Sequence, residues 1–359
     1  MDIQQYFSVT KKEALIGAIL VTVFFGLVFL SRYSRLESSK AISFDNGIHI
    51  YLESNTGLDG LIDHLKKEDA NFDEDAFRWA SRLLGWRSFQ QGHYYLEGDY
   101  PYESLFSKFA LGIQDAVNVT ILPGITAERF SKNLSNSLSI DSATVMEQLN
   151  DSTFLKKLKL TKEQLFGRML PDTYSMYWTI SPENVIKKIL DEFEERVTKP
   201  YGERAKELGY SIDEIVAMAS IVEWEATKDE EKPIISGLYW NRINKRMYLQ
   251  ADPTVNFALG ERRRLLFKDY SYDHPFNTYV NLGLPPGAIT NPSLITIEAT
   301  LYPEQHNYIY MVANPEGGHV FTRTFKEHQI ESEKWRKWLQ RQYRIKRQRE
   351  AEEGNSGTN

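Results

Sequence analysis

An uncharged apolar run near the N-terminus limits most strongly what this chain can fold into. Ala14 to Leu30 reads ALIGAILVTVFFGLVFL, seventeen residues without a charge. A helix needs about 20 apolar residues, with a range of about 17–25, to cross a membrane. A cleaved signal peptide is the alternative, but its apolar core is usually about 7–15 residues, and SRYSRLESSK is a poor cleavage site. We therefore expect an uncleaved transmembrane anchor at residues 14–31.

The charges that flank this run do not settle its orientation. Lys11 and Lys12 precede it, whereas Arg32, Arg35 and Lys40 follow it. By the positive-inside rule this count does not favour export of the C-terminal part, although large domains cross membranes largely regardless of charge.

The composition of the chain narrows the classes of function. Its 359 residues have room for two or three domains. A net charge of −6 argues against general nucleic-acid binding. The absence of Cys excludes disulfides and cysteine chemistry, and a zinc site would need His and carboxylates alone.

The hydrophobic pattern predicts two α+β parts after the anchor. Short alternating runs and amphipathic helices predict a small α+β module first. A larger α+β domain follows it. This domain should contain a long helix that breaks near Pro200 and a loop-rich stretch from Gly237 to His328. The expected boundaries are a linker at 32–43, the small module at 44–115, the larger domain at 116–340 and a charged, partly disordered tail at 341–359.

One predicted helix carries a carboxylate on its apolar side. Ser211 followed by Glu214 fits a capping box, so a helix should start there and run through ASIVEWEAT. At about 100° per residue, Glu223 projects into the apolar arc and Glu225 to the other, solvated side. Burial would raise the pKa of Glu223, as a general acid requires. The alternative is a buried Glu paired with an Arg or a backbone donor.

The C-terminal half resembles the endolytic murein transglycosylase family, the YceG-like proteins. The matching strings are PDTY, ASIVEWEAT, NRINKRMYLQADPTVNFALG, HPFNTYVNLGLPPGAITNPS and YIYMVANPEGGHVFTRTFKEH, within residues 160–328. The resemblance implies a LysM-like module and a YceG-like catalytic domain outside the membrane, behind a cytoplasmic N-terminus at residues 1–13. It also implies cleavage of nascent peptidoglycan to leave 1,6-anhydro-N-acetylmuramic acid ends, with Glu223 as the catalytic residue and peptidoglycan synthases as candidate partners.

The matching strings also contain candidates for substrate contact, each with a scaffold role as the alternative: Gln250, Asp252, Asn277, Tyr279 and Asn291. Where the family commonly carries Glu before PDTY, this chain has Phe166, so the role of that Glu cannot be transferred.

Other chemistries find little support in the sequence. The chain has no H-E-x-x-H and no G-x-S-x-G motif, and we expect neither a metal nor a cofactor. His319 and His328 are expected to be structural or to line a pocket. A non-catalytic wall-binding or scaffolding membrane protein is the alternative function, but such a protein has no need for a lone carboxylate on an apolar face.

The expected topology can be tested with reporters fused after Asn359. A reporter that works only outside the cytoplasm should give signal there, because the anchor stays uncleaved and the rest of the chain is exported. A signal only from a cytoplasmic reporter at the same position would overturn this topology.

Overall fold

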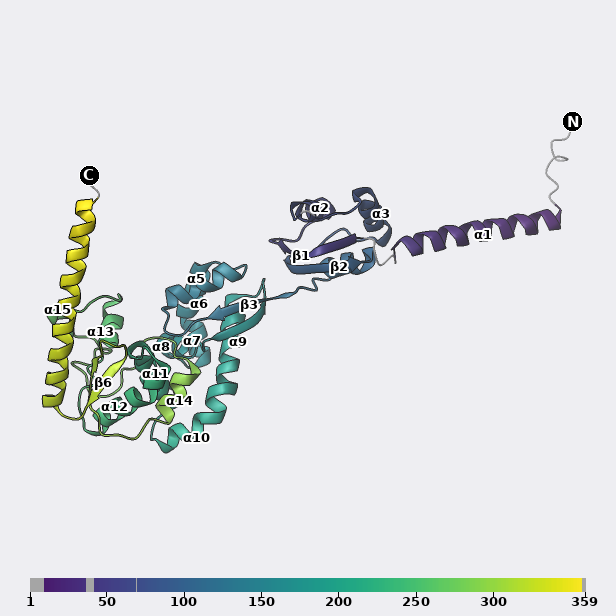
Figure 1. Ribbon diagram of the computed structural model, residues 1–359. Coiled ribbons are helices and arrows are strands. Elements are labelled where there is room, and N and C mark those ends of the chain that lie inside the picture. The colour runs from purple at the N-terminus through teal and green to yellow at the C-terminus, as the bar shows by residue number, and fades with distance from the viewer. Residues whose placement is uncertain (1–9, 37–41, 69, 357–359) are drawn as a thin grey trace. The chain divides into compact units, whose positions relative to one another are not determined.

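The protein divides into two compact units. The computed structural model describes residues 10–36, 42–68 and 70–356 (Figure 1). The first unit contains the chain up to Val117 together with Ser175–Thr179, and the second contains Asn118–Tyr174 and the chain from Ile180 onward. The division therefore falls within strands β3 (Ala116–Ile121) and β4 (Asp172–Tyr177), which form a two-stranded sheet.

Helix α1 (Lys11–Leu36) contains the predicted anchor. It has 26 residues, its most apolar 18-residue stretch has a mean hydropathy of 2.6, and among the described residues it is the one helix long and apolar enough to cross a membrane. The predicted linker at 32–43 is wrong at both ends. Residues 32–36 continue α1 because neither Gly nor Pro stops the helix, and residues 42–43 belong to β1; residues 37–41 lie outside the described residues.

Beyond α1, the first unit has the order strand, helix, helix, strand, helix. These elements are β1 (Ile42–Leu52), α2 (Leu58–Lys67), α3 (Glu74–Leu84), β2 (Gly92–Tyr100) and α4 (Tyr102–Ala110). Strands β1 and β2 pair antiparallel, with Tyr51 opposite His93. Side chains from both strands and all three helices, such as Leu52, Leu61 and Phe106, are fully buried in a common core. The predicted strands and helices of this segment are confirmed.

The second unit is mostly helical. Its N-terminal helices are α5 (Ala127–Ser137), α6 (Ser142–Asn150), α7 (Ser152–Leu158) and α8 (Lys162–Gly167). Then follow α9 (Pro182–Phe193), a π-helical turn η2 (Glu194–Thr198) and α10 (Lys199–Glu207). The break predicted near Pro200 takes the form of this turn, and Pro200 lies in the first turn of α10, where its missing N–H costs no helical hydrogen bond.

Helix α11 (Ile212–Glu225) lies at the centre of the second unit. The predicted capping box is confirmed, because the Glu214 amide donates to Ser211 Oγ at 3.3 Å and the Ser211 amide donates to Glu214 Oε2 at 2.8 Å. Every residue from Ile215 to Val222 is buried. The helix contacts α8, α10, α12 (Lys232–Asn244), α13 (Asp252–Leu259) and α14 (Leu294–Leu301). No side of the helix is therefore exposed to solvent along residues 215–222.

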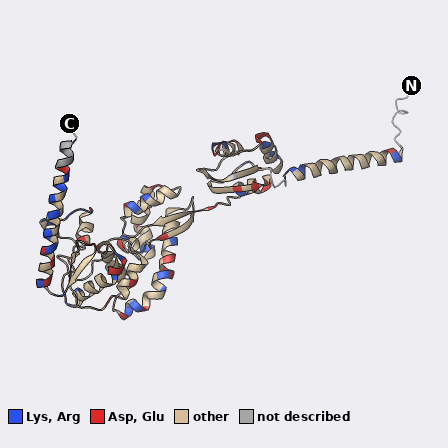
Figure 2. Ribbon diagram, in the orientation of Figure 1, with Lys and Arg blue, Asp and Glu red and all other residues tan. Residues whose placement is uncertain are grey.

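The chain ends in a hairpin and a long helix. Strands β5 (Tyr310–Ala313) and β6 (His319–Thr322) pair antiparallel, and α15 (Phe325–Ser356) packs against them. Charges of both signs follow α15 along its length (Figure 2). The tail predicted to be partly disordered is helical as far as Ser356, and residues 357–359 lie outside the described residues.

The close approach of α8 to α11 predicts a stability difference between two glycines. A Cβ on Gly167 would lie 2.6 Å from Ala288 Cβ and 3.0 Å from Val216 Cγ1, whereas one on Gly202 in α10 meets nothing within 4 Å. Gly167→Ala should therefore lower the free energy of unfolding by about 1–3 kcal/mol. The control Gly202→Ala should raise it by about 0.5–1 kcal/mol, because Ala is the better helix former. Denaturant unfolding of the full chain in detergent measures both, and equal effects would contradict the packing.

Candidate active site

The last turn of α11 presents three consecutive side chains to three different surroundings. Successive residues of an α-helix are about 100° apart around its axis. Glu223 meets the N-terminus of α14, and the Trp224 indole donates to the Gly124 carbonyl at 2.9 Å. Glu225 lines a separate cavity. The two carboxylates are therefore close in the chain but chemically distinct.

Glu223 is a fully partnered carboxylate. Its Oε2 accepts hydrogen bonds from the Ser293 amide at 2.9 Å, the Ser293 hydroxyl at 2.8 Å and the Thr296 hydroxyl. Its Oε1 pairs with Lys232 Nζ at 3.4 Å, and the side chains of Glu223 and Lys232 are only 9% and 6% exposed. The buried ion pair that the sequence left as an alternative is thus present, with Lys in place of Arg.

Glu225 has a much poorer set of partners. Its Oε1 accepts one hydrogen bond, from the Tyr239 hydroxyl at 3.1 Å. Burial raises the pKa of the Glu225 carboxyl to about 7, although Tyr239 and Arg242 act in the opposite direction. The expectation that Glu225 is solvated is wrong. The helical projection assumed that one side of α11 faces solvent. Other elements of the fold surround this helix instead.

A cavity of about 340 Å³ adjoins Glu225, and three predicted contact residues line it: Gln250, Asp252 and Tyr279. The Tyr279 hydroxyl donates to Asp252 Oδ1 at 2.6 Å. Burial, followed by the bond to Asp252, holds the pKa of Tyr279 well above its usual range, so this hydroxyl stays a donor at neutral pH. His319 and His328 also line the cavity, as expected.

Arg242 brings a positive charge to the same cavity. Its guanidinium donates to the carbonyls of Ile309 and Leu249, each at 2.7 Å, and more weakly to Gln250 Oε1 at 3.5 Å. Within the described ranges, Arg242 pairs with no carboxylate at salt-bridge distance. The cavity therefore combines a proton donor, Glu225, with a fixed cation.

Gln250 occupies a strained backbone conformation at the cavity wall. Its φ is +51°, in the left-handed region that non-Gly residues rarely adopt. The Gln250 amide donates to the Thr278 carbonyl at 3.1 Å, which ties this loop to the segment that carries Tyr279. Such conformations cluster at functional sites, where the surrounding structure maintains them.

Asn277 and Asn291 hydrogen-bond to the backbone within the protein. Both are fully buried. The Asn277 amide donates to the carbonyls of Tyr270 and Tyr272, and its Oδ1 accepts from the Tyr279 amide.

Asn291 ties together three separate stretches of chain. Its side-chain amide donates to the carbonyls of Leu122 and Met169, and its Oδ1 accepts from the Ile125 amide. As with Asn277, both ends of the side chain are engaged within the protein. Substrate contact by these two residues stays a prediction, and their hydrogen bonds are those of the scaffold alternative.

The sequence reasoning missed Tyr239 and Arg242. The two lie three residues apart on α12, which places them on one face of the helix. Two polar side chains at this spacing in an otherwise apolar helix are the sequence pattern that could have identified them as site residues. Across the described residues, no group of three or more His, Asp and Glu side chains could hold a metal ion.

Comparison with known proteins shows to which family this chain belongs. The model of the YceG-like family matches residues 50–334, so this chain belongs to that family. The endolytic murein transglycosylase of Bacillus subtilis strain 168 is 31% identical over 305 residues, covering 80% of this chain and 84% of the relative. The endolytic murein transglycosylase of Streptococcus pneumoniae D39 is 24% identical over 277 residues, and the match spans only 50% of its length.

A solved structure supports the same fold. The crystal structure of a YceG-like protein from Listeria monocytogenes matches 80% of this chain and 99% of its own, with a TM-score of 0.55 and 26% sequence identity. The chain therefore has a mixed helix-and-sheet YceG-like fold, as the resemblance implied.

The different surroundings of the two carboxylates predict opposite effects on stability. Between about pH 4.5 and pH 7, the folded chain retains a proton on Glu225 that the unfolded chain has released. Wild-type stability should therefore fall as pH rises through this window. Glu225→Gln removes that loss and should raise the free energy of unfolding at pH 8 by about 1–3 kcal/mol, with little change at pH 4.

Glu223→Gln is the matched comparison. It removes the buried partner of Lys232, which keeps its 2.7 Å pair with the exposed Asp229, and should lower the free energy of unfolding by about 1–3 kcal/mol at neutral pH. Chemical denaturation at pH 4 and pH 8 measures both variants. If Glu225→Gln were the more destabilising of the two at pH 8, the assignment of the surroundings would be wrong.

Proposed function

We propose that this protein is a membrane-anchored lytic transglycosylase of peptidoglycan. It would cleave nascent glycan strands between N-acetylmuramic acid and N-acetylglucosamine, leave 1,6-anhydro-N-acetylmuramic acid ends and so terminate strand elongation. Membership of the family supports the substrate class, since relatives carry the name endolytic murein transglycosylase. The observation that carries the chemistry is a carboxyl with a pKa of about 7 in a polar cavity.

A single carboxyl can carry out the whole reaction. Protonated Glu225 gives its proton to the leaving glycosidic oxygen as the bond from that oxygen to C1 breaks, and positive charge develops at C1. The substrate's own N-acetyl group can shield that charge. The Glu225 carboxylate then takes the proton of the C6 hydroxyl while this oxygen bonds to C1. No water is consumed, and the carboxyl is regenerated.

The surroundings of Glu225 suit both halves of this cycle. A pKa near the working pH lets one group serve as acid and then as base. The Tyr239 hydroxyl donates to Oε1 and orients the carboxyl, and it stays protonated because burial holds its pKa well above the usual range. Arg242 supplies a positive charge that helps the carboxylate form after the first proton transfer.

The catalytic role expected of Glu223 stays a prediction, and the geometry supports Glu225 better. Glu223 accepts three hydrogen bonds on one oxygen and pairs with Lys232 through the other. These partners engage both carboxylate oxygens of Glu223 within the protein. We propose that Glu223 fixes the end of α11 against α14 and so positions Glu225.

The N-terminal part would place this activity at the membrane. We propose that α1 spans the cell membrane once, with residues 1–13 in the cytoplasm and both units on the extracytoplasmic side. The order strand, helix, helix, strand in the first unit supports a LysM-like module that holds glycan strands. Peptidoglycan synthases remain the candidate protein partners, because they make the strands that this enzyme would cut.

The activity of the Glu225→Gln variant distinguishes an enzyme from a non-catalytic scaffold. Comparison with Glu223→Gln shows which of the two carboxylates is the acid. With peptidoglycan strands and the full chain in detergent, Glu225→Gln should lower kcat by at least about 10²-fold, because it cannot donate a carboxylic proton. Glu223→Gln should retain more activity at a temperature where both variants are folded. The reverse order would assign the acid to Glu223.

Product analysis by mass spectrometry tests the type of reaction. Anhydro ends without oxygen from isotopically labelled water are expected. Labelled reducing ends would instead identify a hydrolase. Intact strands after digestion with the wild-type chain would favour the non-catalytic scaffold.

A further inference from the structure

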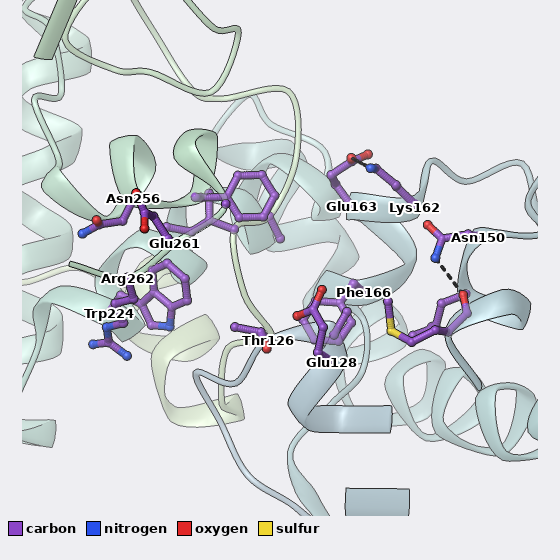
Figure 3. A pocket seen from close by; sticks show the side chains of 17 residues that line it. Thr126, Glu128, Asn150, Lys162, Glu163, Phe166, Trp224, Asn256, Glu261 and Arg262 are labelled. Atoms are coloured by element: carbon purple, nitrogen blue, oxygen red, sulfur yellow. Dashed lines mark hydrogen bonds and ion pairs between the residues drawn. The ribbon is translucent and has the colours of Figure 1, made fainter. Parts of the chain in front are cut away.

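A second cavity, of about 260 Å³, lies on another side of the end of α11 (Figure 3). Trp224, which precedes Glu225, lines it together with Phe166 and Phe257. Helix α13 connects the two cavities. Asp252 at its start lines the Glu225 cavity, and Phe257 near its end lines the second one. Eight helical residues at 1.5 Å each separate the ends of α13 by about 12 Å, so one extended ligand can reach both.

The walls of this cavity are aromatic, with a cation at the rim. The Arg262 guanidinium lies 5.1 Å from the centre of the Trp224 ring, and Figure 3 shows the two side chains together. The Trp224 ring is fixed by its hydrogen bond to the Gly124 carbonyl. Gly260 ends α13 in the left-handed conformation, with a φ of +72°, and so turns the chain that carries Arg262 back over the cavity.

Two opposite charges in the cavity remain without an ionic partner. Glu261 pairs with Arg263 at 2.6 Å, and Glu163 lies 3.6 Å from Lys162. Within the described part of the chain, neither Arg262 nor Glu128 forms a salt bridge, although both line the cavity. A ligand that fills this space should therefore have an aliphatic body, a carboxylate for Arg262 and an amino group for Glu128.

We propose that this cavity binds the peptide branch of the glycan strand, at a residue that carries both an amino group and a carboxylate. This inference rests on the proposed function and names the part of the substrate that the second cavity recognises. The N-acetylglucosamine ring carries neither an ammonium nor a carboxylate group, and a muramic acid without its peptide carries only the carboxylate of its lactyl ether, whereas the attached peptide carries both groups. Recognition would favour strands whose peptides are intact and would set the register of cleavage at Glu225.

Phe166 contributes to this selectivity. It lines the cavity, where Glu128, Glu163 and Glu261 already supply carboxylates. The Phe166 ring packs edge-on against Phe130, with 5.9 Å between ring centres, and adds an apolar surface instead. The cavity of this chain is therefore suited to an aliphatic branch that ends in a carboxylate.

Cleavage kinetics of the full chain in detergent test the proposal on two substrates: strands with intact peptides and strands stripped of peptide by an amidase. Arg262→Gln should raise KM for intact strands by about tenfold, which corresponds to about 1.4 kcal/mol. Its kcat should remain at the wild-type value, and its KM for stripped strands, whose muramic acids carry a lactyl carboxylate but no ammonium group, should rise less than its KM for intact strands. Arg262→Lys should restore part of the affinity, because it keeps the charge. The control Arg264→Gln removes an exposed cation that does not line the cavity and should change nothing.

A binding measurement separates this proposal from the proposed function. A muramoyl tripeptide that ends in a diamino acid has no glycosidic bond to cleave, and calorimetry should show about tenfold weaker binding by Arg262→Gln. A neutral N-acetylglucosamine oligomer should bind both chains equally. Equal losses on intact and stripped strands, or no loss of tripeptide binding, would overturn the proposal. Tripeptide binding without any strand cleavage would overturn the proposed function alone.

Discussion

Burial of the end of α11 is the constraint on which the site depends. Elements of the fold surround this helix from Ile215 to Val222, and its last turn carries two partly buried carboxylates. A buried charge is costly unless partners compensate for it. Lys232 and the N-terminus of α14 compensate Glu223, whereas Glu225 has one phenol and a cation held by carbonyls. One carboxylate is thereby held by fixed partners, and burial raises the pKa of the other to about 7.

The loops that follow α12 complete the site because buried amides fix them to the helices. Asn291 joins the start of the second unit to the segment before α14, and Asn277 holds the turn that carries Tyr279. The strained Gln250 closes the same wall. Helix α13 then places the polar cavity and the aromatic cavity on a common support. The proposed glycan substrate is a long polymer, and such an arrangement would let binding away from the reacting bond set its position.

Local patterns predicted much of this fold. The capping box at Ser211, the strands of the first unit and the apolar helix follow from periodicity and turn chemistry, which operate over a few residues. The surroundings of Glu223 and Glu225 could not be predicted in this way. A helical projection tells which residues share a side, but not how many sides the rest of the chain covers. Asn277 and Asn291 illustrate the same limit, since an amide that holds a loop and an amide that binds sugar look alike in sequence.

A direct titration of Glu225 tests the central claim. The difference infrared spectrum between the wild-type chain and Glu225→Gln isolates the carbonyl stretch of one protonated carboxyl and follows it with pH. The account predicts that this band disappears with a midpoint near pH 7, the pKa to which burial raises Glu225. A midpoint below pH 5 would contradict the account, because Glu225 would then have no proton to donate at neutral pH.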